Sequence, residues 1–229
     1  MSQRPVHELI RELSDTLVLL ASHVRLNLLL ALEALKEDDS EKARRVKNVD
    51  YQVDEAEVRL ESQCLSFLAL QQPVARDLRT IVAIMKINDY MARIGDLAVH
   101  VVERVADIDS YQYQQYDLEN VGAKVAEMLQ SAIEAFSSKD TSVAARVFVM
   151  EEEIDYMHRT IVRNVMAEMK VSSDHIEQLI AVLSVSRYLE RIADHATKTA
   201  REVVYLVTGQ TAPRQRESSY EKLFESLRN

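Results

Sequence analysis

Residues that break helices are scarce in this chain of 229 residues, which contains three glycines and three prolines. A sheet-rich fold needs a turn about every 8 to 12 residues, and turns depend on these residue types. Tryptophan is absent, and aromatic residues make up 6% of the chain. Leu, Ala, Glu, Arg and Met, which favour helices, are common instead. The composition therefore excludes a sheet-rich fold and favours an all-α protein.

Cysteine and excess positive charge are also lacking. The single cysteine, Cys64, cannot form an internal disulfide, which fits a reducing compartment, and we expect it to be a small buried helix residue. The net charge of −9 leaves no general basic face for nucleic acid. An acidic balance suits a cytoplasmic protein or one that collects cations.

Long apolar runs are missing as well. The most apolar stretch near the N-terminus, residues 26–35, contains Asn27 and Glu33 and is too short to span a membrane. We therefore expect a cytoplasmic protein that approaches a membrane only through partners.

Apolar residues recur at spacings of three or four, which predicts long amphipathic helices. In the first half we expect helices over about 6–36, 41–70 and 74–106, with Asp39 or Ser40 capping the second and Pro73 opening the third. Residues 107–115 carry no apolar period and are predicted to be a linker. In the second half we expect helices over about 118–136, from about 141 to 170, and from about 173 to 207, where Gly209 ends the last.

The two halves repeat one plan. Residues 31–46 (ALEALKEDDSEKARRV) and 132–147 (AIEAFSSKDTSVAARV) are identical at seven of sixteen positions, at an offset of 101. Residues 90–98 (YMARIGDLA) and 188–196 (YLERIADHA) are identical at five of nine positions, at an offset of 98. We predict two tandem antiparallel three-helix bundles related by a pseudo-twofold: a first unit over 1–112, a second over 113–209, and a polar tail over 210–229.

Acidic residues recur at equivalent helix positions. Pairs at i, i+4 lie one turn apart on one helix face, where like charges repel. A pair that recurs at equivalent positions therefore indicates a functional role. Convergent carboxylates suit hard cations such as Mg²⁺, Mn²⁺, Ca²⁺ or iron. The candidate metal ligands are Asp50, Asp54, Asp96, Glu151, Asp155, Glu190 and Asp194.

The second unit is the preferred metal site, because the first unit has Ala92 where the second has Glu190. Asp89, two turns before Asp96, is a possible substitute ligand. The alternative is a solvated acidic face whose charges are neutralised by Arg93 and Arg191.

Nothing in the sequence assembles a catalytic base and a nucleophile. A di-iron bundle needs Glu-x-x-His on two helices. Asp155 and His158 have the i, i+3 spacing, but no second copy appears. No phosphate-binding glycine loop, nucleophile elbow or zinc spacing is present. We expect a protein that is not an enzyme.

Three segments resemble the PhoU family, which regulates phosphate signalling in bacteria. They are LALQQPVARDLR over 68–79, RIGDLA over 93–98 and LERIADHA over 189–196, and the resemblance extends from the first helix to about Gly209. It implies paired three-helix bundles without known enzymatic activity. It also implies a negative regulator of the phosphate-starvation response that links the Pst phosphate ABC transporter ATPase to a PhoR-type sensor histidine kinase.

The resemblance further implies a homodimer and metal clusters bound through Glu/Asp-x-x-x-Asp motifs, with Ala92 departing from the pattern. Candidate docking residues for partners are Asp77, Arg79, Arg93 and Arg191. For residues 71–79 a purely structural role in starting a helix is an equal alternative. Alternative functions are a carboxylate-bundle metal protein and an accessory protein of a different phosphate transporter.

Overall fold

The computed structural model describes residues 6–171, 173 and 175–210. Within these residues the chain forms seven α-helices and one 3₁₀ helix and contains no strand, which confirms the all-α class. The elements are α1 (Val6–Glu37), α2 (Ser40–Gln71), α3 (Ala75–Val102), η1 (Val105–Asp107), α4 (Ser110–Gln115), α5 (Leu118–Ser138), α6 (Thr141–Met169) and α7 (Ile176–Thr208). The polar tail predicted after residue 210 lies outside the described residues.

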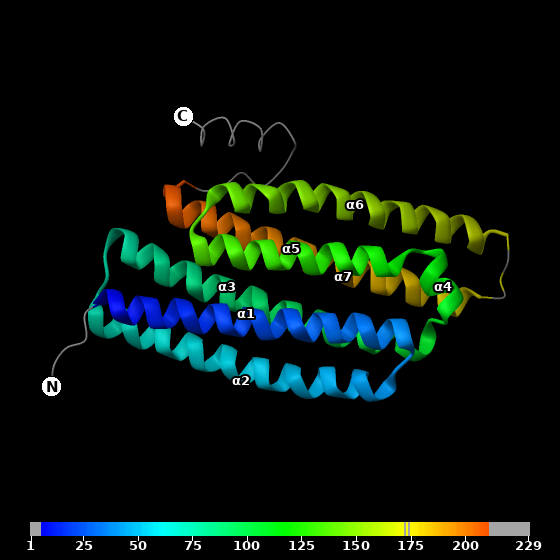
Figure 1. Cartoon of the computed structure of the whole chain (residues 1–229), viewed down its shortest axis with the longest axis horizontal. Helices are drawn as coiled ribbons and strands as arrows, with labels where there is room; N and C mark the ends of the chain where they lie inside the picture. The colour runs from blue at the N-terminus through cyan, green and yellow to red at the C-terminus, as the bar shows by residue number, and fades with distance from the viewer. Residues whose placement is uncertain (1–5, 172, 174, 211–229) are drawn as a thin grey trace.

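The six long helices form two three-helix units that lie side by side along the long axis (Figure 1). α1, α2 and α3 pack against one another, and so do α5, α6 and α7. Each unit buries a stripe of apolar side chains; Leu28, Leu60 and Met91 are fully buried in the first unit, and Phe148 and Leu189 in the second. The repeat predicted from the sequence is therefore a repeat of packed units.

The units are joined mainly by α3 against α7, and also by α1 against α5. α3 and α7 run in opposite directions, so the α2–α3 turn and the α6–α7 turn lie at opposite ends of the molecule (Figure 1). Gly122 permits the close approach of α1 and α5, since a Cβ there would lie 2.6 Å from Leu32 Cδ2. Aromatic contacts cross the α3–α7 joint, from Tyr90 to His195 and from His100 to Tyr188.

Aspartate caps start the second helix of each unit, as the sequence predicted for Asp39. The Asp39 carboxylate accepts hydrogen bonds from the backbone N–H groups of Glu41 and Lys42. Asp140, its repeat equivalent, accepts one from the N–H of Ser142. Such caps satisfy N–H groups that have no partner within the helix.

The predicted linker contains more structure than we expected. α3 ends at Val102 rather than near Ala106, and Asp109 caps the short helix α4 by accepting hydrogen bonds from two backbone N–H groups. Tyr113 and Tyr116 are buried here. The apolar signal was missed because two tyrosines three residues apart are too few to establish a helical period.

One helix, α1, is long and apolar enough by length and composition to cross a membrane, but 44% of its most apolar window is buried in the protein core. The sequence argument considered only uninterrupted apolar runs and so did not detect it. A buried core helix passes the same test, so this property alone is weak evidence for a membrane span. Cys64 is fully buried, as expected.

Candidate metal centre

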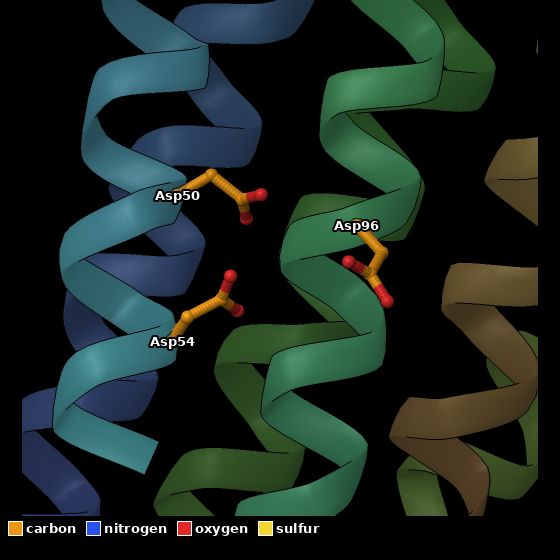
Figure 2. Close-up of side chains that lie close together, drawn as sticks. All are labelled: Asp50, Asp54 and Asp96. Carbon is orange, nitrogen blue, oxygen red and sulfur yellow. The ribbon is translucent and has the colours of Figure 1, made fainter. Parts of the chain in front are cut away.

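Three aspartates converge between the second and third helices of the first unit. Asp50 and Asp54 lie one turn apart on α2, and Asp96 faces them from α3 (Figure 2). One carboxylate oxygen from each lies within 4.8 Å of the others. Two oxygens that bind one cation at about 2.1 to 2.5 Å are separated by at most about 5 Å, so this spacing fits a hard cation. Among the described residues this is the one acidic or histidine group gathered so closely.

Asp50 is the deepest of the three. Its Oδ1 atom is buried and has no hydrogen-bond partner. The space for this atom depends on Gly95 of α3, because a Cβ at that position would lie 2.5 Å from Asp50 Oδ1. A buried oxygen acceptor without a donor is costly unless a cation or water satisfies it. The residues present therefore fit a bound metal ion, which would supply the missing positive charge.

The electrostatics of the cluster agree with this arrangement. Burial, followed by the charges of Asp54 and Asp96, raises the pKa of Asp50 from 3.8 to about 6. Burial and Asp96 also raise the pKa of Asp54. Carboxylates that repel one another and lose water hold protons more tightly, and a cation between them reverses both effects.

A neighbouring arginine partly offsets the negative charge. The Arg93 Nη1 atom lies 3.7 Å from Asp96 Oδ2, and its Nε atom lies 3.8 Å from Asp89 Oδ1. These contacts match the alternative of a neutralised acidic face. They are exposed and involve only Asp96 among the three clustered aspartates. The charge of His100 acts on Asp50, but burial and the neighbouring aspartates outweigh it and the pKa of Asp50 stays raised. Asp89, the proposed substitute ligand, does not belong to the cluster.

The second unit places its four acids differently. Glu151, Asp155, Glu190 and Asp194 are not among the residues gathered within 4.8 Å. The Glu190 carboxylate accepts a 2.7 Å hydrogen bond from Arg187 Nη1, and Asp155 lies 3.8 Å from Arg159. The geometry thus favours the first unit over the second, opposite to the preference drawn from the motif count.

Arg201 explains part of the difference between the acidic residues of the two units. Burial raises the pKa of Glu151 to about 7, and the nearby charge of Arg201 acts in the opposite direction. By the repeat offset of 98, the first unit has Glu103 in place of Arg201, and it has Gly95 in place of Ala193. The second unit therefore contains a cation of its own and lacks the extra space beside the third helix.

The candidate docking residues have local partners in three of four cases. Asp77 lies 4.0 Å from His7 Nδ1, and Arg93 pairs with aspartates as described. The guanidinium of Arg79 lies beside Gly209, where α7 ends, since a Cβ on Gly209 would lie 3.6 Å from Arg79 Nη1. A cation at a helix C-terminus is stabilising, so Arg79 has a structural reason to be present. Arg191 is exposed.

The sequence reasoning missed an apolar surface around the α2–α3 turn. Leu70, Val74 and Leu78 expose 77%, 76% and 41% of their surface. The repeat-equivalent positions at the α6–α7 turn are also apolar and exposed, with Val171 at 89% and Ile176 at 39%. The sequence held a signal for this surface, because Leu70 and Leu78 lie within residues 68–79, one of the segments that resemble the family.

Comparison with known proteins decides the family. The PhoU domain model matches residues 17–105 and 118–203, one match in each three-helix unit. The chain is a member of the PhoU family. It is 32% identical to the phosphate-specific transport system accessory protein PhoU homolog of Deinococcus radiodurans, over 79% of this chain and 85% of that protein. It is 31% identical to the Escherichia coli PhoU accessory protein, over 79% and 76% of the two chains.

Solved PhoU structures have the same fold. The crystal structure of PhoU from Pseudomonas aeruginosa superposes with a TM-score of 0.83 at 28% identity, covering 90% of this chain and all of that one. The phosphate transport system regulatory protein PhoU from Streptococcus pneumoniae gives a TM-score of 0.85 at 26% identity, covering 91% and all of the two chains. The family is one of accessory and regulatory proteins rather than of catalysts, and the resemblance inferred from the sequence is confirmed.

Proposed function

We propose that this protein is a negative regulator of the phosphate-starvation response and influences phosphate uptake, acting as an adaptor between the Pst phosphate transporter ATPase and a PhoR-type sensor kinase. The observation that carries the proposal is family membership over both units, with 85% and 76% coverage of two relatives named for the phosphate-specific transport system. The exposed apolar residues at the α2–α3 and α6–α7 turns support docking, since partner proteins bind through such surfaces. On this proposal the protein acts in the cytoplasm as a homodimer.

We further propose that Asp50, Asp54 and Asp96 hold a hard cation, such as Mg²⁺, Mn²⁺, Ca²⁺ or iron. The support is the buried, unpartnered Asp50 oxygen and the close approach of three carboxylates. When bound, the ion supplies a positive charge that joins α2 to α3. Asp50 and Asp54 then lose their mutual repulsion, and the acidic face between the two helices becomes less negative.

The adaptor role is tested in cells grown with ample phosphate. Deletion of the gene should switch on a phosphate-starvation reporter such as alkaline phosphatase, and the wild-type gene should restore repression. Affinity capture from the same cells should recover the Pst ATPase or the sensor kinase. A silent reporter in the deletion strain would refute the regulatory role, and recovery of neither partner would refute the adaptor mechanism.

The metal proposal has a separate test in purified protein. Metal content after equilibration and desalting is measured by plasma mass spectrometry for the wild type and for Asp50→Asn. The matched control is Asp155→Asn, which removes an acid at the equivalent helix face of the second unit. Loss of metal in the first variant alone supports the site between α2 and α3. Equal metal in wild type and Asp50→Asn would contradict it.

A further inference from the structure

The outer face of the first unit carries a groove between α1 and α2. It has a volume of about 540 Å³. Its walls are mainly aliphatic, and its lining residues from α1 extend from Leu20 to Glu33. Beside it, Leu19 and Leu26 each expose 58% of their surface, although both lie on a helix whose other face forms the core. The face therefore combines an apolar ridge with an apolar groove.

The second unit shows that the fold does not require this apolar face. At the repeat offset of 101, Leu19, Leu26 and Leu30 correspond to polar residues of α5. These are Asn120, Glu127 and Ser131. Because both units pack their three helices in the same way, the exposed Leu19 and Leu26 serve something other than the core of the unit, whereas Leu30 packs partly against that core.

The two units also differ across the groove. In the second unit the Lys124 side chain bridges α5 to α6 through a 2.5 Å contact with Glu153. The equivalent residues of the first unit are His23 and Gln52, which line the open groove and form no ion pair. A salt bridge therefore spans the two helices at this position in the second unit, and the first unit has no ion pair at the equivalent position.

A polar atom at the groove points to a bound partner. Asn27 lines the groove and is 2% exposed, and its Nδ2 atom donates to the Val46 carbonyl at 3.2 Å. Its Oδ1 atom is buried and has no partner. The second unit has an apolar Met128 at this position. A buried acceptor without a donor is costly, so an Asn27 side chain that moves to expose this oxygen to a donor on a covering surface gains a hydrogen bond.

We infer that this α1–α2 face is the dimer interface, and that its occupant is the same face of a second copy of the chain. The inference rests on the homodimer of the proposed function and specifies its surface. Residues 19, 23, 26, 30 and 33 follow the alternating four-and-three spacing of a helix-pairing seam. A twofold axis can place the leucine ridge of each copy in the groove of the other, and it brings His23 and Gln52, both potential donors, toward Asn27 of the partner.

The size of the face favours a second copy over a single bound helix. α1 and α2 each contain 32 residues, so a face two helices wide is about 20 Å by 48 Å, or roughly 960 Å². A standard stable interface buries about 800 Å² on each partner. Charged residues such as Glu33 and Arg45 lie at the margin of the groove, which matches the usual apolar centre and polar rim.

The test uses the full-length protein and the variant Leu26→Glu, which installs the residue found at the equivalent position of the second unit. Light scattering coupled to size exclusion should give twice the 26.2 kDa chain mass for the wild type and the single-chain mass for the variant. The matched control is Val149→Glu, since Val149 is 55% exposed on the second unit and should leave the dimer intact. Circular dichroism and thermal unfolding check that Leu26→Glu remains folded.

A second measurement keeps the inference falsifiable if that variant misfolds. Under oxidising conditions, Leu26→Cys should form a disulfide-linked dimer while Val149→Cys does not; the native Cys64 is buried and cannot compete. A wild-type dimer that survives Leu26→Glu and is not linked through Leu26→Cys would overturn the interface but leave the homodimer standing. A monomeric wild type would overturn both. A monomer that binds phosphatidylglycerol vesicles through Leu26 would overturn the inference in favour of a lipid surface. The regulatory role is tested separately by the phosphate-starvation reporter, so none of these results decides it.

Discussion

Replacing Asp50 by Asn should have opposite effects on stability with and without metal. The Asn side chain has nearly the same shape as a protonated aspartate but carries no charge at any pH. In metal-free protein the charged Asp50 is destabilising, because burial and two neighbouring carboxylates raise its pKa from 3.8 to about 6. The native state therefore binds this proton more tightly than the unfolded state does. The free energy of unfolding falls as pH rises from about 4 to about 6, and Asp50→Asn escapes this loss.

The magnitude follows from the same shift. A rise in pKa from 3.8 to about 6 corresponds to about 3 kcal/mol if solvent screening is ignored. Asp50 is only partly buried, so we expect Asp50→Asn to stabilise the metal-free protein by about 1–2 kcal/mol at pH 7.5. At pH 4.5, where Asp50 in the native state is mostly protonated, the difference should be well under 1 kcal/mol. With a cation at a hundred times its dissociation constant, the wild type should gain about 2.7 kcal/mol, which the variant lacks.

Urea unfolding followed by circular dichroism measures these differences. Wild type and Asp50→Asn are compared with a chelator at pH 4.5 and 7.5, and with added Mn²⁺ at pH 7.5. The reasoning predicts that the variant is more stable with chelator at pH 7.5 and less stable with metal. A variant that is destabilised equally at both pH values in chelator would refute the electrostatic argument, because it would show that Asp50 stabilises the fold through packing.

Three further predictions follow from single contacts. Gly95→Ala should abolish metal binding and destabilise the protein by about 1–3 kcal/mol, since the new Cβ would lie 2.5 Å from Asp50 Oδ1. Metal titration and urea unfolding test these two effects. Asp39→Ala should cost about 1 kcal/mol of unfolding free energy by removing two hydrogen bonds at the start of α2, and an unchanged urea midpoint would contradict the capping role. Leu70→Ser, at a site 77% exposed, should change stability by less than about 0.5 kcal/mol yet reduce capture of the transporter ATPase or kinase from cells; full capture would exclude the α2–α3 turn as a docking surface.

The architecture could be predicted because the signals were long and repeated. Helical periodicity over 28 or more residues identified the helices that pair most extensively, and the repeat at offsets of 98 and 101 identified the two units. The aspartate at position 39 marked a helix start through its side-chain chemistry. The short element α4 could not be predicted from the sequence. It contains six residues, and its apolar contacts come from tyrosines, which also occur in loops.

The sequence named Asp50, Asp54 and Asp96 as candidate ligands, but it favoured the second unit over the first as the metal site. Counting acids favoured the second unit, because Ala92 removes one carboxylate from the first. The count omitted the cations that lie among those acids, Arg187 and Arg201, whose proximity depends on side-chain geometry. It also omitted Gly95. A lone glycine inside a long helical pattern was the available signal, since such a residue often marks a close approach.

The two units show how one fold can hold negative charge between helices in two ways. In the second unit the charge of Arg201 partly offsets the burial of Glu151, whose pKa is still raised to about 7. The first unit has no such cation at the equivalent position and instead leaves Asp50 Oδ1 without a partner in the space beside Gly95. The same asymmetry recurs on the outer face, where Lys124 and Glu153 form a salt bridge in the second unit and His23 and Gln52 leave an open groove in the first. In both places the second unit has an arginine or lysine, Arg201 or Lys124, where the first unit has none, so we expect ligand binding and assembly to depend on the first unit.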